Sequence, residues 1–126
     1  GAAREPEPAE QVQALLDSWS SAIGLSVRVR DGAWDRLSDP LRATAVADTI
    51  SEGLANAVRH GNGAPVRLEL RPGEPEGVRV VIVSGGTLGA RALGDHSGIG
   101  LRQLSEHGTV AIREDAGRVE LAVAIP

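Results

Sequence analysis

The run from Ile50 to Gly61 constrains this chain strongly, because three polar side chains recur in it at helical spacing. Glu52, Asn56 and His60 are each four residues apart, which puts them along one stripe of an α-helix. Apolar side chains fall on the opposite side of the same helix, namely Ile50, Leu54, Ala57 and Val58. The segment therefore predicts a helix with one face toward a core and a second, polar face.

The polar stripe has two interpretations. A carboxylate, an amide and an imidazole stacked in this way can bind a metal, polarise a water molecule and approach phosphate oxygens. An ordinary amphipathic helix also turns a polar side toward solvent. The residue types alone do not separate these interpretations, so the order of the elements around the helix has to decide between them.

The rest of the chain alternates between helical and extended patterns. Asp39 can cap the polar-stripe helix and Pro40 can take its first position, and Gly61 with Pro65 stops it near His60. The remaining periodicities predict, in chain order, a helix over 10–23, strands over 25–29, 66–70 and 78–83, a glycine-rich loop over 85–97, a helix over 99–106, and strands over 109–113 and 119–125. The strands 66–70 and 78–83 should form a hairpin.

A second motif, Ser97-Gly-Ile-Gly-Leu101, stands where the glycine-rich loop leads into a helix. Gly98 and Gly100 would let backbone N–H groups and the positive end of that helix approach a phosphate. Two glycines at this spacing also mark plain loop-to-helix junctions. The position after the loop, together with the polar-stripe helix, favours phosphate binding.

Together the two motifs resemble the N box and the second glycine box of the GHKL ATPases, a group that includes gyrase, Hsp-type chaperones, histidine kinases and MutL proteins. Glu52-Gly-Leu-Ala-Asn56-Ala-Val-Arg-His60 is most similar to the ATP-binding catalytic domain of bacterial sensor histidine kinases. The resemblance extends from about Gln11 onward. It implies the α+β Bergerat fold, a two-layer sandwich in which about three helices cover one face of a mixed, largely antiparallel sheet.

The resemblance also implies ATP and Mg²⁺ as cofactors and assigns residues to them. Asn56 would hold magnesium against the nucleotide phosphates, and Arg59 falls where a basic residue commonly meets phosphate. Gly98, Gly100 and Leu101 match the segment that closes the ATP lid and opens the following helix.

Glu52 is the candidate catalytic residue. It would orient an attacking water, as in the hydrolysing members of the superfamily, or support the neighbouring site residues, as the favoured kinase resemblance implies. His60 is expected near phosphate or lid without a catalytic role, or simply as a helix-terminal histidine that interacts with the helix dipole. Arg91, in the expected lid, is a candidate for neutralising phosphate charge when the loop closes, or a solvated side chain.

The first glycine box of the family reads Asp-x-Gly-x-Gly after a hydrophobic strand, and its Asp accepts a hydrogen bond from the adenine amino group. Here Ser84 stands in place of the Asp, Gly86 is kept and Leu88 replaces the second glycine. A hydroxyl can still accept a hydrogen bond. The change from a charged to a neutral acceptor is worth about 1 to 2 kcal/mol. The segment from Leu101 to Thr109 is also shorter than is usual in sensor kinases.

Composition removes several competing chemistries. All 13 basic residues are Arg, which excludes a P-loop lysine, a Schiff-base lysine and a Ser-Lys dyad in this chain. The absence of Cys excludes disulfides, thiolate catalysis and zinc-cysteine sites. A net charge of -4 without a basic block argues against nonspecific nucleic-acid binding, and no apolar stretch approaches the roughly 20 residues of a membrane span. With Trp19 and Trp34 as the only aromatic residues, the core must be aliphatic.

Residues 1–9 are polar and proline-bearing, and we expect a linker or chain edge there, followed by one ATP-binding domain over 10–126 with its lid at about 85–97. We expect this domain to be a cytoplasmic piece of a longer protein, whose parent is either free or membrane-anchored.

The resemblance implies that the domain binds Mg-ATP and presents the γ-phosphate to a histidine on a separate dimerisation domain. That acceptor domain and a response regulator would be its partners in two-component signalling, with no nucleic-acid or membrane contact of its own. His96 and His107 lack the sequence context of a phospho-acceptor and are expected to be surface histidines. Two alternatives stay open: a stand-alone serine-kinase or anti-sigma-type regulator of the same fold, and a degenerate interaction module without ATP binding.

Overall fold

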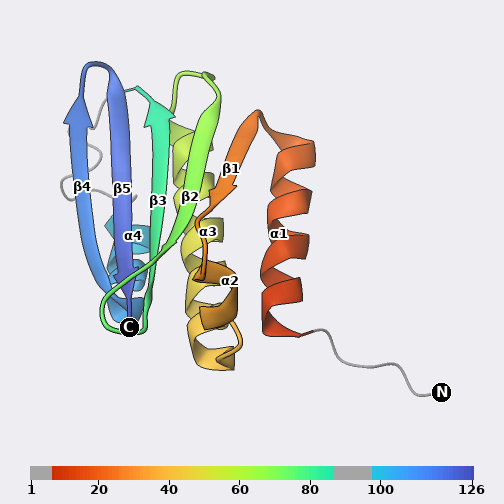
Figure 1. The fold of residues 1–126 in the computed structure, drawn as a ribbon. Coiled ribbons are helices and arrows are strands. Elements are labelled where there is room, and N and C mark those ends of the chain that lie inside the picture. Colours follow the sequence, from red (N-terminus) through yellow and green to blue (C-terminus); the bar gives the residue numbers. More distant parts are fainter. Residues whose placement is uncertain (1–6, 87–97) are drawn as a thin grey trace.

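Alternating apolar residues build a five-stranded sheet. The computed structural model describes residues 7–86 and 98–126, and its strands lie in the order β1-β2-β3-β5-β4 (Figure 1). Their bounds are β1 Leu25–Val29, β2 Val66–Pro72, β3 Val78–Gly85, β4 Thr109–Asp115 and β5 Arg118–Ile125. β1 is parallel to β2, and the other neighbouring pairs are antiparallel. The predicted mixed, largely antiparallel sheet and its hairpin are confirmed.

Every second side chain of these strands points to an inner face. Ile82 pairs with Leu68 on one side and Leu121 on the other, so the three form one apolar row across the sheet. Further buried strand residues on this face are Val66, Leu70, Val78, Val80, Val123 and Ile125. Trp19 and Trp34 are half-buried and pack against this core. The large buried side chains are therefore aliphatic, as the composition predicted.

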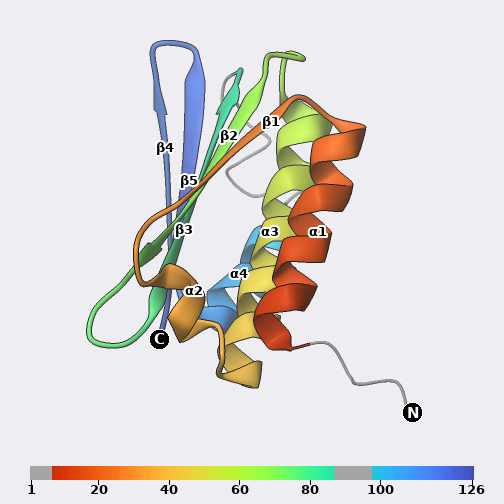
Figure 2. The same cartoon turned by 45° about the vertical axis from the view of Figure 1, so that its right-hand side comes forward.

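The helices lie on the inner face of the sheet and leave its other face open (Figures 1 and 2). They are α1 Pro8–Ala22, α2 Ala33–Arg36, α3 Pro40–His60 and α4 Gly98–His107. The predicted two-layer α+β arrangement is confirmed, whereas α2 was not predicted, because a single helical turn is too short to show a periodicity. In the part of the chain that the structure describes, no helix is both long and apolar enough to cross a membrane.

Both ends of α3 follow from the residues that the sequence places there. The Asp39 side chain accepts a hydrogen bond from the Leu41 backbone N–H at 3.0 Å, and Pro40 takes the first helical position. At the other end, a Cβ added to Gly61 would overlap the Ala57 carbonyl oxygen. The predicted start and stop signals of this helix are confirmed.

α3 occupies the middle of the helix layer, where it contacts α1, α4 and strands β3 and β5. Its closest approach to the sheet is at Gly53, where an added Cβ would overlap Ile82 Cδ1 and lie 3.2 Å from Leu121 Cδ2. Ile50 and Leu54 on either side of this glycine are fully buried. The absence of a side chain at position 53 thus lets the helix backbone approach the apolar row of the sheet.

One residue of the expected apolar side of α3 does not belong to it. Val58 is 54% exposed, whereas Ala57 is half-buried and packs against the core. The buried stripe passes from Leu54 to Ala57, so Val58 is turned toward solvent at the last turn. Because α3 has neighbours on several sides, Thr49 is also fully buried, and its hydroxyl donates to the Ala45 carbonyl at 2.7 Å.

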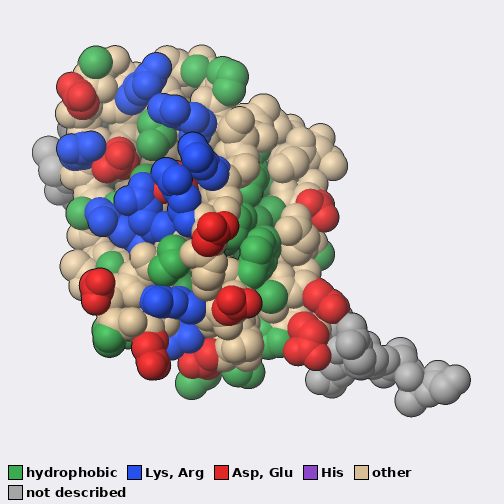
Figure 3. Space-filling model, in the orientation of Figure 1, with side chains coloured by type: hydrophobic (Ala, Val, Ile, Leu, Met, Phe, Trp, Pro, Cys, Tyr) green, Lys and Arg blue, Asp and Glu red, His purple; other side chains and the backbone are tan. Residues whose placement is uncertain are grey.

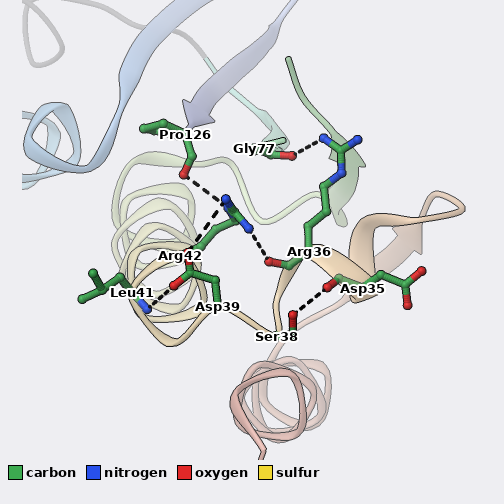
Figure 4. Close-up of polar contacts among 8 residues, drawn as sticks. All are labelled: Asp35, Arg36, Ser38, Asp39, Leu41, Arg42, Gly77 and Pro126. Atoms are coloured by element: carbon green, nitrogen blue, oxygen red, sulfur yellow. Dashed lines mark hydrogen bonds and ion pairs between the residues drawn. The ribbon is translucent and has the colours of Figure 1, made fainter. Parts of the chain in front are cut away.

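Two arginines tie α2 and α3 to the end of the sheet where the β2–β3 turn and the C-terminal residue meet (Figure 4). The Arg36 guanidinium donates to the carbonyls of Gly73 and, at 2.9 Å, Gly77. The Arg42 guanidinium donates to the Arg36 carbonyl at 2.9 Å and to the Pro126 backbone oxygen at 3.3 Å. Backbone oxygens of the turn and of the last residue are thereby satisfied by charged donors.

Candidate functional site

The polar stripe of α3 lies between the buried and the solvent-facing sides of the helix. Glu52, Asn56 and His60 are each half-buried, and Arg59 is exposed. Glu52 lies on the flank of α3 that faces α4, where side chains of both helices line one hollow. The stripe is therefore partly covered by neighbouring elements rather than fully open to solvent.

A hollow of about 430 Å³ opens between these two helices. Its walls are Asp48, Ser51 and Glu52 from α3 and Gln103, Leu104, Glu106 and His107 from α4. Three carboxylates line it, so a bound phosphate group would need a counter-cation. Within residues 7–86 and 98–126, no cluster of three His, Cys, Asp or Glu side chains could hold a metal. A magnesium ion at Asn56 would therefore need oxygen ligands from a nucleotide.

Leu104 and His107 are two of the residues through which α4 packs into the structure. Leu104 is 1% exposed, and His107 Nε2 lies 3.2 Å from Asp48 Oδ2. His107, expected to be a surface histidine, is partly exposed and also has Asp48 as a partner. The pair joins residues that are far apart in the sequence, so no local pattern could reveal it.

The direction of α4 brings its first turn toward the stripe. Figure 2 shows α3 and α4 running in opposite directions, and His107 at the end of α4 contacts Asp48 in the first half of α3. The start of α4, with Gly98, Gly100 and Leu101, is therefore directed toward the later turns of α3, which carry Asn56. The predicted helix over 99–106 is confirmed, and it begins at Gly98, within the glycine motif.

The end of β3 lies against the C-terminus of α3. Gly86 has a φ of 122°, which favours glycine, and an added Cβ would lie 3.3 Å from the His60 carbonyl oxygen. The Gly86 N–H donates to the Gly117 carbonyl at 2.8 Å, which fixes this bend to the β4–β5 turn. Ser84 is half-buried two residues earlier, opposite Val119 of β5. The structure thus brings the segment that resembles the first glycine box to His60.

Other predicted site residues lie outside the described residues. The segment 87–97 contains Leu88, Arg91 and His96 and most of the expected lid, of which only Gly85 and Gly86 are described. Gly85 belongs to β3, so the strand extends two residues beyond its predicted end at Val83.

No family model and no curated protein matches this chain. Several solved structures do match it in fold. The histidine kinase domain of a blue-light-activated histidine kinase from Erythrobacter litoralis has a TM-score of 0.64 at 17% identity, over 100% of this chain and 70% of that one. The catalytic domain of the histidine kinase ThkA, in a nucleotide-free form, has a TM-score of 0.59 at 16% identity, over 95% of this chain and 91% of that one. The Acinetobacter baumannii histidine kinase AdeS has a TM-score of 0.61 at 11% identity, over 94% of this chain and 62% of that one.

The chain has the fold of a histidine kinase catalytic domain. On this histidine kinase fold, the three segments singled out in the sequence belong to neighbouring elements: the polar stripe to α3, the glycine bend to the end of β3 and the second glycine motif to the start of α4. They are separate in the sequence, and the packing of α3 against β3 and α4 brings their elements together.

Proposed function

We propose that this chain binds Mg-ATP beside α3 and presents the γ-phosphate to a histidine on a separate dimerisation domain. The observation that carries the proposal is the convergence of three motif-bearing elements, α3, the end of β3 and α4, in a chain with the histidine kinase catalytic fold. Each motif has a plain structural explanation when it is taken alone. Their common location favours a single ligand that contacts all three.

Each group in this arrangement has a task that its chemistry fits. The Asn56 amide oxygen would coordinate magnesium, and Glu52, one helical turn earlier, would accept a hydrogen bond from the Asn56 amide N–H and so orient it. The Arg59 guanidinium would contact a phosphate. Backbone N–H groups at Gly98 and Gly100 would meet phosphate oxygens at the positive end of α4. The Ser84 hydroxyl would accept from the adenine amino group near His60.

The transfer step requires positioning more than side-chain chemistry. The acceptor histidine nitrogen forms a bond to the γ-phosphorus while the bond from that phosphorus to the bridging oxygen of ADP breaks. Magnesium neutralises phosphate charge when it is bound, which the carboxylates near Glu52 make necessary. The side chains of this chain hold the phosphates in line, and the acceptor domain supplies the nucleophile. A response regulator would then take the phosphoryl group from that histidine.

Calorimetric titration with ATP and magnesium tests the proposal. We expect saturable binding in the micromolar to submillimolar range that requires magnesium and is lost in Asn56→Ala. Thr44→Ala, which changes an exposed residue of the same helix, is the matched control and should bind like the unchanged chain. Binding that is equal in Asn56→Ala and without magnesium would contradict the assigned site.

Ser84 favours one alternative, a module that kept the fold and lost ATP. An absence of heat at millimolar ATP in the titration would support this alternative, because the neutral hydroxyl then fails to replace a carboxylate acceptor. The serine-kinase or anti-sigma-type alternative predicts ATP binding as well. The acid stability of the phosphorylated product distinguishes this alternative from the histidine kinase, since phosphohistidine is labile to acid and phosphoserine is stable.

A further inference from the structure

The outer face of the sheet, opposite the helices, carries a concentration of arginine. Strand alternation and register place more than half of the 13 basic residues on this face, and Figure 3 shows their side chains gathered in a band over the sheet. These residues are Arg28, Arg30, Arg67, Arg71, Arg79, Arg113 and Arg118. The whole chain has a net charge of -4, so positive charge is segregated onto one surface. We call this surface the arginine face.

Some of these arginines are used within the protein and others are not. Glu69 binds Arg71 and lies 3.4 Å from Arg30 Nε, and Glu120 lies 3.1 Å from Arg113 Nε. The remaining four have exposed or solvent-facing side chains and no carboxylate of the described residues within salt-bridge distance: Arg28, Arg67, Arg79 and Arg118. Their charges are available to a partner.

Stability of the sheet does not account for this arrangement. Arg71 stands directly opposite Arg79 in the β2–β3 ladder, and like charges at directly opposed positions destabilise a sheet. Burial of the inner face already supplies the hydrophobic stabilisation, and an uncharged polar side chain would solvate the outer face equally well. The clustering therefore indicates a binding role.

The solvent-facing surface of the arginine face contains a shallow groove. Two adjoining hollows, of about 360 and 410 Å³, share Ser26, Arg67 and Val83 in their walls. Val81 lines the first hollow, so half-buried valines from β3 give the groove an apolar component. Arginines from three strands surround it, namely Arg28, Arg67, Arg71 and Arg118. The result is a shallow groove with an aliphatic floor and guanidinium walls.

We propose that this groove binds an extended acidic polypeptide segment in which Asp or Glu alternates with small aliphatic side chains. Guanidinium groups pair with carboxylates in a bidentate manner, and Val81 and Val83 suit the intervening aliphatic groups. Glu69 and Glu120 interrupt the positive surface, so a ligand whose negative charges alternate with uncharged groups fits it better than a continuous phosphodiester backbone. The groove crosses β1, β2, β3 and β5, about 14 Å at the usual strand spacing, which four or five extended residues span.

Fluorescence anisotropy with a labelled peptide of alternating Glu and Val tests this proposal on the full chain. We expect saturable binding that weakens at least about tenfold in the double variant Arg67→Gln/Arg118→Gln, as two charge-assisted contacts are lost. Ala14→Glu/Ser20→Glu makes the same change in net charge on exposed positions of α1 and should bind like the unchanged chain. Asn56→Ala should also leave peptide binding unchanged, so this result stands apart from the ATP test.

Amide chemical shifts of the unchanged chain provide a measurement that does not depend on any variant folding. The peptide should shift amides of Ser26, Arg67 and Val83 and leave those of α1 in place. Equal peptide binding by the double arginine variant and the α1 control would overturn the proposal. So would shifts confined to the helix layer, or saturable binding of an oligonucleotide or of phosphatidylserine vesicles by the arginine face without binding of the peptide.

Discussion

Glu69 shows how one residue organises the charges around it. Its carboxylate accepts a hydrogen bond from Arg71 Nε at 2.7 Å and lies near Arg30, the residue after β1. The Arg71 hydrogen bond, with the charges of Arg71, Arg30 and Arg28, lowers the pKa of Glu69 below its ordinary value of 4.5, against an opposing effect of burial. Glu69 thereby holds together Arg71 of β2 and Arg30, which directly follows β1.

This lowered pKa predicts a pH-dependent contribution to stability. The unfolded chain binds a proton at Glu69 at a higher pH than the folded chain does, so the stabilisation is present above about pH 4.5 and is lost as pH falls through the folded-state pKa. Glu69→Gln should lower the free energy of unfolding by about 0.5 to 1 kcal/mol at pH 7. Urea unfolding at pH 7, 5 and 3 should show this difference shrinking toward low pH, and a constant difference would contradict the assignment.

Single residues also show what the sequence could and could not reveal. Asp39, Pro40 and Gly61 act through the adjacent backbone, so their roles as cap, first residue and stop were predictable from local spacing. The contact of His107 with Asp48 depends on how α4 packs against α3, and the exposure of Val58 depends on where the neighbours of α3 end. Such properties belong to tertiary packing, which a helical periodicity does not contain.

At the scale of helices and strands, the N-terminus of α3 depends on one side chain. Asp39→Ala removes the acceptor for the Leu41 N–H and should lower the free energy of unfolding by about 1 kcal/mol. Asp39→Asn keeps a capping oxygen and should lose much less. Urea unfolding of the two variants distinguishes the cap from the weaker charge contact with Arg42, at 3.9 Å, because both substitutions remove the charge. Equal losses would assign the effect to that charge.

The junction between α4 and β4 is a second element-level prediction. A Cβ added at Gly108 would overlap the Ala124 carbonyl of β5, which is backbone and cannot rotate away. Gly108→Ala should therefore destabilise the protein by about 1 to 3 kcal/mol through forced displacement. Gly24→Ala is the matched control, since its nearest neighbour lies 3.9 Å away at Pro65. Thermal unfolding measures both, and similar melting temperatures for the two variants would be the contradictory result.

The order of elements was predictable because each long segment has a strong period and a clear boundary signal. Their lateral arrangement was not, since the alternation within β1 or β5 does not say which strand lies beside it. β5 inserts between β3 and β4, and β1 joins the sheet in parallel. Only this pairing brings Arg28, Arg67 and Arg118 to one surface. The arginine face could therefore not be predicted from the sequence of each strand taken separately.

For the molecule as a whole, the two proposed binding sites lie on opposite faces of the sheet. The inner face holds the helix layer and the candidate ATP site, and the outer face carries the arginines. The two proposed sites share β3, because Gly86, just after this strand, lies against the His60 carbonyl oxygen, whereas Ser84 lines the larger hollow of the arginine face. This common strand gives a physical route by which a ligand on one face could affect the other. The predicted site residues in 87–97 stay predictions.

Ser84 offers the sharpest test of how the three segments cooperate. Ser84→Asp restores the charged acceptor of the family's first glycine box, and ATP affinity should rise by up to about tenfold if adenine lies at the end of β3. Ser84→Asn supplies a neutral acceptor of similar size and should gain much less. The control is calorimetry of Ser84→Asp combined with Asn56→Ala. An aspartate at position 84 that contacts adenine should not restore the magnesium-dependent part of the binding that Asn56→Ala removes. An unchanged affinity in a folded Ser84→Asp variant would mean that the end of β3 does not contact adenine, and the Mg-ATP proposal would then rest on α3 and α4 alone.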